Sequence, residues 1–142
     1  RSALVFYSAQ QMFDLVNAIP DYPKFLPGCS SARIISQSDT EMVASLQVSK
    51  AGISHSFTTR NTLQTPHRIA MQLVDGPFKQ LQGGWEFLPL NDSACKVILK
   101  LEFEFSNKLV QFAFGKIFSE LAASMVNAFT QRAKMVYGES HV

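Results

Sequence analysis

The chain has 142 residues, of which 46% are hydrophobic and 17% charged, and its formal net charge is +2. This length and composition predict one folded domain with an ordinary soluble core. A charge this weak argues against a protein that coats nucleic acid, although it leaves room for a local basic patch.

The two cysteines predict neither a metal site nor a redox motif. Cys29 and Cys95 lie far apart and form no C-x-x-C pair, so we expect two reduced thiols in a cytoplasmic protein. No apolar run approaches the roughly 18 residues that span a bilayer, and the start lacks a signal-peptide pattern. Because the chain begins with Arg1, an upstream targeting segment stays open.

The first quarter of the chain predicts one strand followed by two short helices. Residues 2–7 read as a strand, after which Ser8 and Gln11 have the spacing of a helix capping box. Three prolines between positions 19 and 28 exclude a continuous helix there, so a short helical turn is expected between Pro20 and Leu26.

The middle of the chain alternates short apolar and polar runs with turn residues. Such short connections join antiparallel hairpins, because a parallel return needs a long crossover. The last strand alternates most regularly, which predicts one face in the core and the other in water. Six strands are predicted here, at residues 33–37, 41–50, 54–64, 68–74, 81–89 and 94–106.

A long amphipathic helix is predicted from the cap at Asn107 to about Tyr137, roughly 45 Å in length. Phe112 and Val126 fall on its otherwise polar face, where they are either ordinary exposed residues or part of a docking surface. The predicted apolar stripe comprises Val110, Phe114, Ile117, Phe118, Leu121, Met125, Ala128, Phe129 and Val136.

This order of elements predicts an α+β fold of the helix-grip type. A curved antiparallel sheet of about seven strands would wrap around the long C-terminal helix, with two short helices after the first strand. We expect a single domain over residues 1–138 and a tail at 139–142. Such a grip commonly leaves a hollow between the sheet and the helix.

The run V-D-G-P-F-K-Q-L-Q-G-G-W-E-F-L at residues 74–88 bears on that hollow. Gly83 falls in the inward row beside Trp85, where a glycine leaves nothing to pack. Either it marks a bulge or bend in the strand, or it leaves space that forms part of a cavity.

Three polar residues fall on one face of the strand at residues 54–64. If that face points inward, His55, Thr59 and Asn61 need partners, which a ligand or trapped water would supply. A register error of one residue would instead turn all three outward. The other histidines, His67 in a turn and His141 in the tail, are expected in solvent.

These patterns give a set of candidate ligand-cavity residues. Arg132 falls within the apolar stripe of the long helix, where it either reaches past the sheet edge to water or meets a polar ligand head. The full set is His55, Phe57, Thr59, Asn61, Met71, Gly83, Trp85, Phe87, Leu101, Phe103, Phe114, Phe118, Leu121, Met125 and Arg132.

The sequence carries no recognisable catalytic or metal-binding motif. It contains no G-x-S-x-G elbow, H-E-x-x-H pair or phosphate loop. Asp75, the most motif-like carboxylate, is explained by a turn. We therefore expect no enzyme activity, no catalytic residue and no resident cofactor.

Basic residues offer candidate contacts to phosphates. They either scatter as solubilising charge or cluster at one end of the sheet. The candidates are Lys24, Arg33, Lys50, Arg60, Arg68 and Lys79.

Several stretches together resemble the START-like, helix-grip family of polyketide cyclases and coenzyme-Q-binding proteins, and within it a branch of bacterial ribosome-association toxins. D-G-P-F-K followed by G-x-W is typical of the wider family, whereas K-A-G-I-S and the opening of the long helix point to the toxin branch. The stretches are A-L-V-F-Y-S-A-Q-Q-M-F-D-L-V, Y-P-K-F-L-P-G-C, V-S-K-A-G-I-S-H-S-F-T-T-R-N, L-V-D-G-P-F-K-Q-L-Q-G-G-W-E-F and F-E-F-S-N-K-L-V-Q-F-A-F-G-K-I-F.

The resemblance implies two different functions. The toxin branch implies binding to the large ribosomal subunit, a block of its association with the small subunit, and a small antitoxin partner, RatB. The coenzyme-Q-binding relatives imply a carrier that holds ubiquinone or another lipid in the hollow and supports respiration. The resemblance supplies no ribosome-contacting residues, so those candidates come from charge alone.

Overall fold

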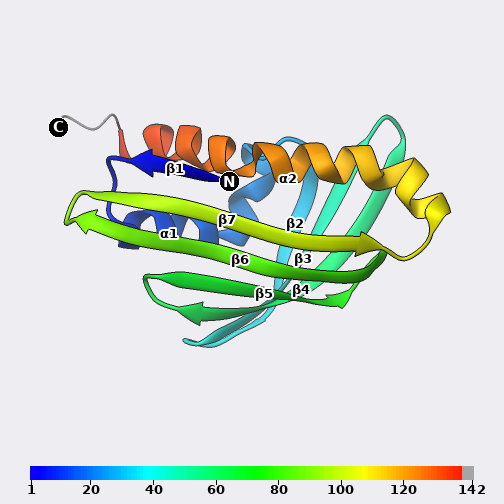
Figure 1. The fold of residues 1–142 in the computed structure, drawn as a ribbon, viewed down its shortest axis with the longest axis horizontal. Coiled ribbons are helices and arrows are strands. Elements are labelled where there is room, and N and C mark those ends of the chain that lie inside the picture. Colours follow the sequence, from blue (N-terminus) through cyan, green and yellow to red (C-terminus); the bar gives the residue numbers. More distant parts are fainter. Residues whose placement is uncertain (139–142) are drawn as a thin grey trace.

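The computed structural model describes residues 1–138 as seven strands, two α-helices and a short 3-10 helix (Figure 1). The predicted tail at 139–142, with His141, lies outside the described residues. The elements are β1 (Ser2–Val5), α1 (Ala9–Asn17), η1 (Ile19–Lys24), β2 (Cys29–Gln37), β3 (Glu41–Lys50), β4 (Ile53–Gln64), β5 (Arg68–Asp75), β6 (Phe78–Asn91), β7 (Ala94–Phe105) and α2 (Lys108–Tyr137).

All seven strands form one antiparallel sheet in the order β1-β7-β6-β5-β4-β3-β2. Strands β2 to β7 follow the chain, and β1 closes the sheet beside β7. In Figure 1 the sheet curves, α2 runs along one side of it, and α1 lies behind β6 and β7 near the C-terminal end of α2. The predicted helix-grip fold is confirmed.

The predicted start of α1 is also confirmed. Ser8 Oγ accepts a hydrogen bond from Gln11 N, and Gln11 Oε1 accepts one from Ser8 N, which completes the capping box. η1 occupies the proline-rich segment and buries Ile19 and Tyr22. Tyr22 OH donates a hydrogen bond to Val16 O, which ties η1 back to α1.

Two strands begin well before their predicted limits. β2 begins at Cys29 rather than at residue 33, because Cys29 pairs with Val48 of β3. β6 begins at Phe78 rather than at residue 81, because Phe78 pairs with Phe105 of β7. Pairing partners far along the chain decide these limits, and local sequence does not reveal them.

The core lies between the concave face of the sheet and one row of α2. Phe114, Phe118, Leu121, Met125 and Phe129 are buried there, as the stripe predicted. The prediction for the two faces of α2 is wrong at two positions. Val126, expected on the polar face, is 6% exposed, and Val136, expected in the stripe, is 48% exposed.

α2 also corrects the expectation that no segment could cross a bilayer. By length and composition alone, this 30-residue helix is apolar enough to span a membrane. The core helix of a folded domain meets the same criterion, and α2 packs its buried row on the sheet. We therefore assign α2 as the central helix of the grip.

Candidate functional site: an apolar cavity inside the grip

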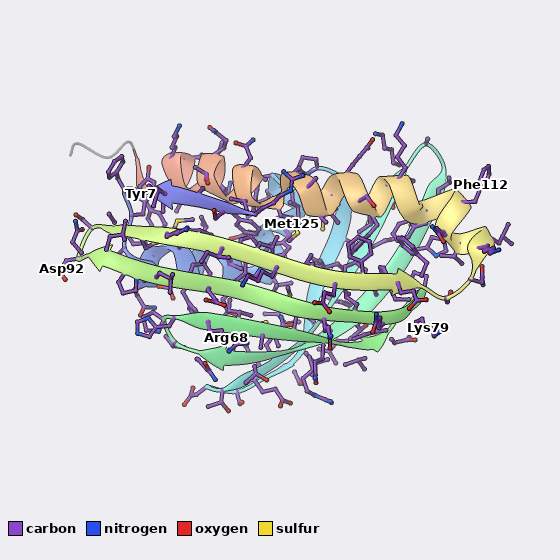
Figure 2. All side chains as sticks on the ribbon, in the orientation of Figure 1. Tyr7, Arg68, Lys79, Asp92, Phe112 and Met125 are labelled. Carbon is purple, nitrogen blue, oxygen red and sulfur yellow. The ribbon has the colours of Figure 1, made fainter. Side chains whose placement is uncertain are left out.

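A small internal cavity lies between α2 and the inner face of the sheet. Its volume is about 50 Å³. Strands β3 to β7 form the floor, α2 forms the roof, and α1 with η1 closes one end. Met125, labelled in Figure 2, lies on the side of α2 that faces the sheet. The predicted hollow therefore exists, but it is small.

Nine of the predicted cavity residues lie on its wall. Their inward direction follows from the alternation of β4 to β7 and from the apolar stripe of α2. That they bind a ligand stays a prediction. The nine are Phe57, Thr59, Asn61, Met71, Trp85, Leu101, Phe118, Leu121 and Met125.

Nine further wall residues were not predicted. Most come from α1, η1 and β3, because the prediction rested on the alternation of the central strands and on the apolar stripe of α2. A signal for the helical end was present, since the capping box and the prolines already located two short helices near the sheet. The additional residues are Val16, Asn17, Ile19, Tyr22, Ala44, Leu46, Ile69, Leu81 and Ala122.

Two neighbouring polar side chains interrupt the apolar wall on β4. Thr59 and Asn61 are 8% and 4% exposed, so of the two registers left open for β4 the inward one is observed. Thr59 Oγ1 donates a hydrogen bond of 2.9 Å to Asn61 Oδ1. Asn17, also on the wall, has a buried Oδ1 without a hydrogen-bond partner among the described residues. The cavity therefore has a polar edge that water or a ligand group would satisfy.

Gly83 does not open the cavity, which corrects the sharper of the two predictions for it. A Cβ added to Gly83 would lie 2.0 Å from Lys100 O, in the backbone of β7. Its φ of +143° also lies in a region that side-chain-bearing residues rarely adopt. No bulge occurs either, because Gly83 and Gly84 pair in register with Leu101 and Lys100. Glycine is needed here for close strand packing.

Four other predicted cavity residues are packed elsewhere in the core. Phe103 and Phe114 contact Phe78, Phe105 and Phe118 in an aromatic cluster that fills the grip near the start of α2. His55 lies inward as predicted, but its ring packs 4.7 Å from that of Phe114. Phe87 packs between Phe13 and Trp85 instead. Because their rings pack against other rings, these four side chains do not line the cavity.

Arg132 lies away from the cavity wall. Its guanidinium lies 5.1 Å from the centre of the Phe25 ring, a cation–π distance, and Nη1 approaches Met135 Sδ at 3.5 Å. Its Nε is buried without a hydrogen-bond partner in the described chain. The structure thus favours packing against the aromatic surface of η1 over contact with a ligand in the cavity.

The predicted basic candidates do not gather at one end of the sheet. Arg68 and Lys79 are well separated in Figure 2. Lys50 and Lys79 belong to the end of the sheet near the start of α2, whereas Arg68 begins β5 at the opposite end. Four of the six form exposed ion pairs: Lys24–Asp21, Lys50–Glu120, Arg60–Glu41 and Lys79–Glu104. Their contact with a ribosome stays a prediction.

Burial is the main cause of the pKa shifts of both cysteines and of Tyr22. Burial raises the pKa of Cys95 to about 11 and also raises that of Cys29, so both thiols stay protonated at neutral pH. Burial likewise raises the pKa of Tyr22. Within residues 1–138, no three His, Cys, Asp or Glu side chains lie close enough together to hold a metal ion.

Comparison with known proteins gives three kinds of match. The family described as polyketide cyclase / dehydrase and lipid transport matches residues 5–130. The ribosome association toxin RatA of Vibrio cholerae is 64% identical over 139 residues, covering 98% of this chain and 96% of the relative. The mitochondrial coenzyme Q-binding protein COQ10 homolog B of Xenopus laevis is 26% identical, covering 99% of this chain and 59% of that protein.

Among solved structures, the Zhui aromatase/cyclase from Streptomyces sp. R1128 superposes with a TM-score of 0.82. The match covers 99% of this chain and 96% of the cyclase, at 15% sequence identity. At this identity the likeness supports the fold alone.

Proposed function

Because the chain belongs to the polyketide cyclase / dehydrase and lipid transport family, and to its branch of ribosome association toxins named RatA, we propose that it inhibits translation. It would bind the large ribosomal subunit in the cytoplasm and block association with the small subunit. The observation that carries this proposal is the 64% identity to a RatA protein over 98% of the chain. A small antitoxin such as RatB would be its regulatory partner.

The chemistry of the interior supports a binding role without catalysis. The two buried polar side chains, Thr59 and Asn61, bond to each other and offer no nucleophile with a base. Both thiols are buried and their pKa values are raised, which suppresses thiolate chemistry. A non-enzymatic protein that acts by occupying a surface is consistent with these features.

The carrier function remains a second candidate, because the cavity wall is almost entirely apolar and a coenzyme Q-binding relative exists. Its weakness is size. Sites for small molecules usually enclose about 300–1,000 Å³, whereas this cavity holds about 50 Å³. A polyprenyl quinone would require α2 or η1 to move outward, while the toxin function requires no opening.

Subunit association tests the main proposal directly. Purified protein added to ribosomes should raise the free-subunit peaks of a sucrose gradient at the expense of joined ribosomes. Lys50→Glu and Arg60→Glu should weaken this effect, and their difference from the wild type should shrink as salt rises, because fewer phosphate contacts lower the salt dependence. Glu120→Gln and Glu41→Gln are matched controls, because they break the same two ion pairs but keep the cations. An unchanged gradient with the wild-type protein would refute the proposal.

Organic extraction tests the carrier. Protein purified from cells that contain quinones should release a stoichiometric quinone or other lipid if the cavity opens to hold one. An extract without lipid would count against the carrier and leave the toxin proposal intact. Gly83→Leu would not serve as a cavity-blocking variant, because its side chain would collide with the backbone of β7. Ala44, on the cavity wall, is the better position.

A further inference from the structure

One aromatic side chain points away from the core at the start of α2. Phe112 is 90% exposed, although most of the other phenylalanines pack into the interior. Leu109, one turn earlier, is 77% exposed. Figure 2 shows Phe112 at the end of the molecule opposite Tyr7. Neither side chain stabilises the fold, and such exposure of large apolar groups commonly marks a binding surface.

Lysines surround this ring. Lys108 and Lys116 are four residues before and after Phe112, so they lie one helical turn to either side of it. Lys50 of β3 reaches the same flank, where its Nζ lies 3.0 Å from Glu120 Oε2, and Lys116 lies 4.0 Å from Glu120 Oε1. We call Lys50, Lys108, Leu109, Phe112 and Lys116 the α2 tip. Its three lysines outnumber Glu120, the carboxylate that pairs with Lys50 and Lys116, so the α2 tip is positively charged.

The α2 tip is built on rigid structure. Asn107 Oδ1 accepts a hydrogen bond of 2.8 Å from Val110 N, which fixes the first turn of α2. Phe114 and Gly115 are buried in the same helical turn as Phe112, and the ring of Phe105 lies 3.6 Å from where a Cβ of Gly115 would stand. The backbone that carries Phe112 is therefore anchored before any partner binds, which lowers the entropic cost of binding.

The combination of an exposed ring and flanking lysines indicates the class of partner. Interfaces between proteins enrich aromatic residues but deplete lysine. Single-stranded nucleic acid, by contrast, is bound by aromatic rings that stack on bases and by cations that contact phosphates. Phenylalanine stacks on any base, so this arrangement suits an unpaired segment and carries little sequence preference.

We propose that the α2 tip binds an unpaired segment of RNA, with one base stacked on Phe112 and the adjoining phosphates held by Lys108 and Lys116. Lys50 extends the cationic surface along the same flank. This inference deepens the proposed function, on which it rests for the identity of the RNA as ribosomal RNA of the large subunit. It adds a contact at the start of α2 to the candidate contact at Arg60 on the exposed face of β4.

The experiment measures co-sedimentation of the protein with purified large subunits. Phe112→Ala and Phe112→Leu should weaken binding about fivefold or more, since a base stacked on an aromatic ring contributes roughly 1–3 kcal/mol. Phe112→Trp should preserve binding, because indole also stacks. Phe6→Ala is the matched control, an exposed phenylalanine at the opposite end of the molecule that is 57% exposed. Circular dichroism checks that each variant folds.

Salt dependence tests the phosphate contacts. Lys108→Gln and Lys116→Gln should each reduce the slope of log affinity against log salt by about 0.7, the value for one phosphate of a single strand. Lys134→Gln, at the far end of α2, should leave the slope unchanged. Wild-type slopes in these variants would overturn the phosphate contacts.

Two outcomes overturn the stacking contact. If Phe112→Leu binds subunits as the wild type does, the tip makes an apolar protein contact instead. If Phe112→Ala binds normally while the wild type still separates subunits, the proposed function stands and this inference fails. If the wild-type protein does not separate subunits, the proposed function fails, and a fluorescein-labelled uridine dodecamer then tests the RNA contact by itself. Binding of the dodecamer that is lost in Phe112→Ala would support the contact, and binding that is unchanged would overturn it.

Discussion

Thr59 Oγ1 and Asn61 Oδ1 lie 2.9 Å apart, so the two buried polar side chains of β4 satisfy each other at the cavity wall. The hydrogen bond between them lowers the cost of burying two polar side chains in an otherwise apolar core. Its stability depends on both members, because a buried donor or acceptor without a partner is costly.

A double-mutant cycle tests this dependence. Thr59→Val should lower the free energy of unfolding by about 1–3 kcal/mol, because it leaves Asn61 Oδ1 without its donor. The double variant Thr59→Val/Asn61→Leu should be closer to the wild type than the two single losses add up to. Urea unfolding measures each value. Strict additivity would show that the hydrogen bond contributes nothing.

Gly83→Ala should destabilise the protein by more than about 2 kcal/mol, because the new Cβ would meet Lys100 O and the backbone would be strained. Gly115→Ala is the matched control. There the new Cβ meets Phe105 at 3.6 Å, an ordinary contact, and alanine in a helix gains about 1 kcal/mol over glycine. Equal stabilities for the two variants in thermal unfolding would contradict this role of Gly83.

Ala44→Val should separate the two candidate functions. Ala44 is buried on the cavity wall, and the larger side chain would occupy part of the cavity at a cost in stability of at most about 1–3 kcal/mol. Because the proposed toxin acts through its surface, subunit separation should match the wild type. Loss of that effect in a folded Ala44→Val protein would show that the cavity must be open or occupied for activity.

Alkaline pH should destabilise the fold through the buried thiol of Cys95. The pKa of Cys95 is raised from about 9 to about 11, so between these values the unfolded chain loses a proton that the folded chain keeps. The unfolded state then binds fewer protons, and stability falls as pH rises. Thermal unfolding between pH 8 and pH 10.5 should show this fall, with a shallower slope in Cys95→Ala. Parallel slopes would exclude a contribution from Cys95.

Local patterns predicted most of the fold. The capping box at Ser8 began α1, the alternation of β4 and β7 set their faces, and Asn107 capped α2 as expected. These features depend on residues a few positions apart. The starts of β2 at Cys29 and of β6 at Phe78 depend instead on Val48 and Phe105, which are distant in the chain. Local sequence patterns do not reveal contacts between residues so far apart in the chain.

The candidate site shows the same division. Inward residues of β4 to β7 and α2 were predicted from periodicity, and many of them reach the cavity. Periodicity cannot say which inward residues face empty space and which face another ring, so Phe103 and Phe114 were assigned to the wall although they fill the aromatic cluster. The cavity prediction for Gly83 was wrong for a related reason. An absent side chain leaves space either for a ligand or for a neighbouring backbone, and here the backbone of Lys100 occupies that space.

The position of β1 has a consequence for biosynthesis. Residues 2–5 pair with residues 95–98 of β7, and Tyr7 OH donates a 2.6 Å hydrogen bond to Gly138 O beyond the end of α2. Chains grow from the N-terminus, and contacts this distant in sequence form late. The first strand therefore waits without a partner until β7 has left the exit tunnel, and the grip closes only when α2 follows. A nascent copy of this chain therefore completes the grip only after α2 has been synthesised.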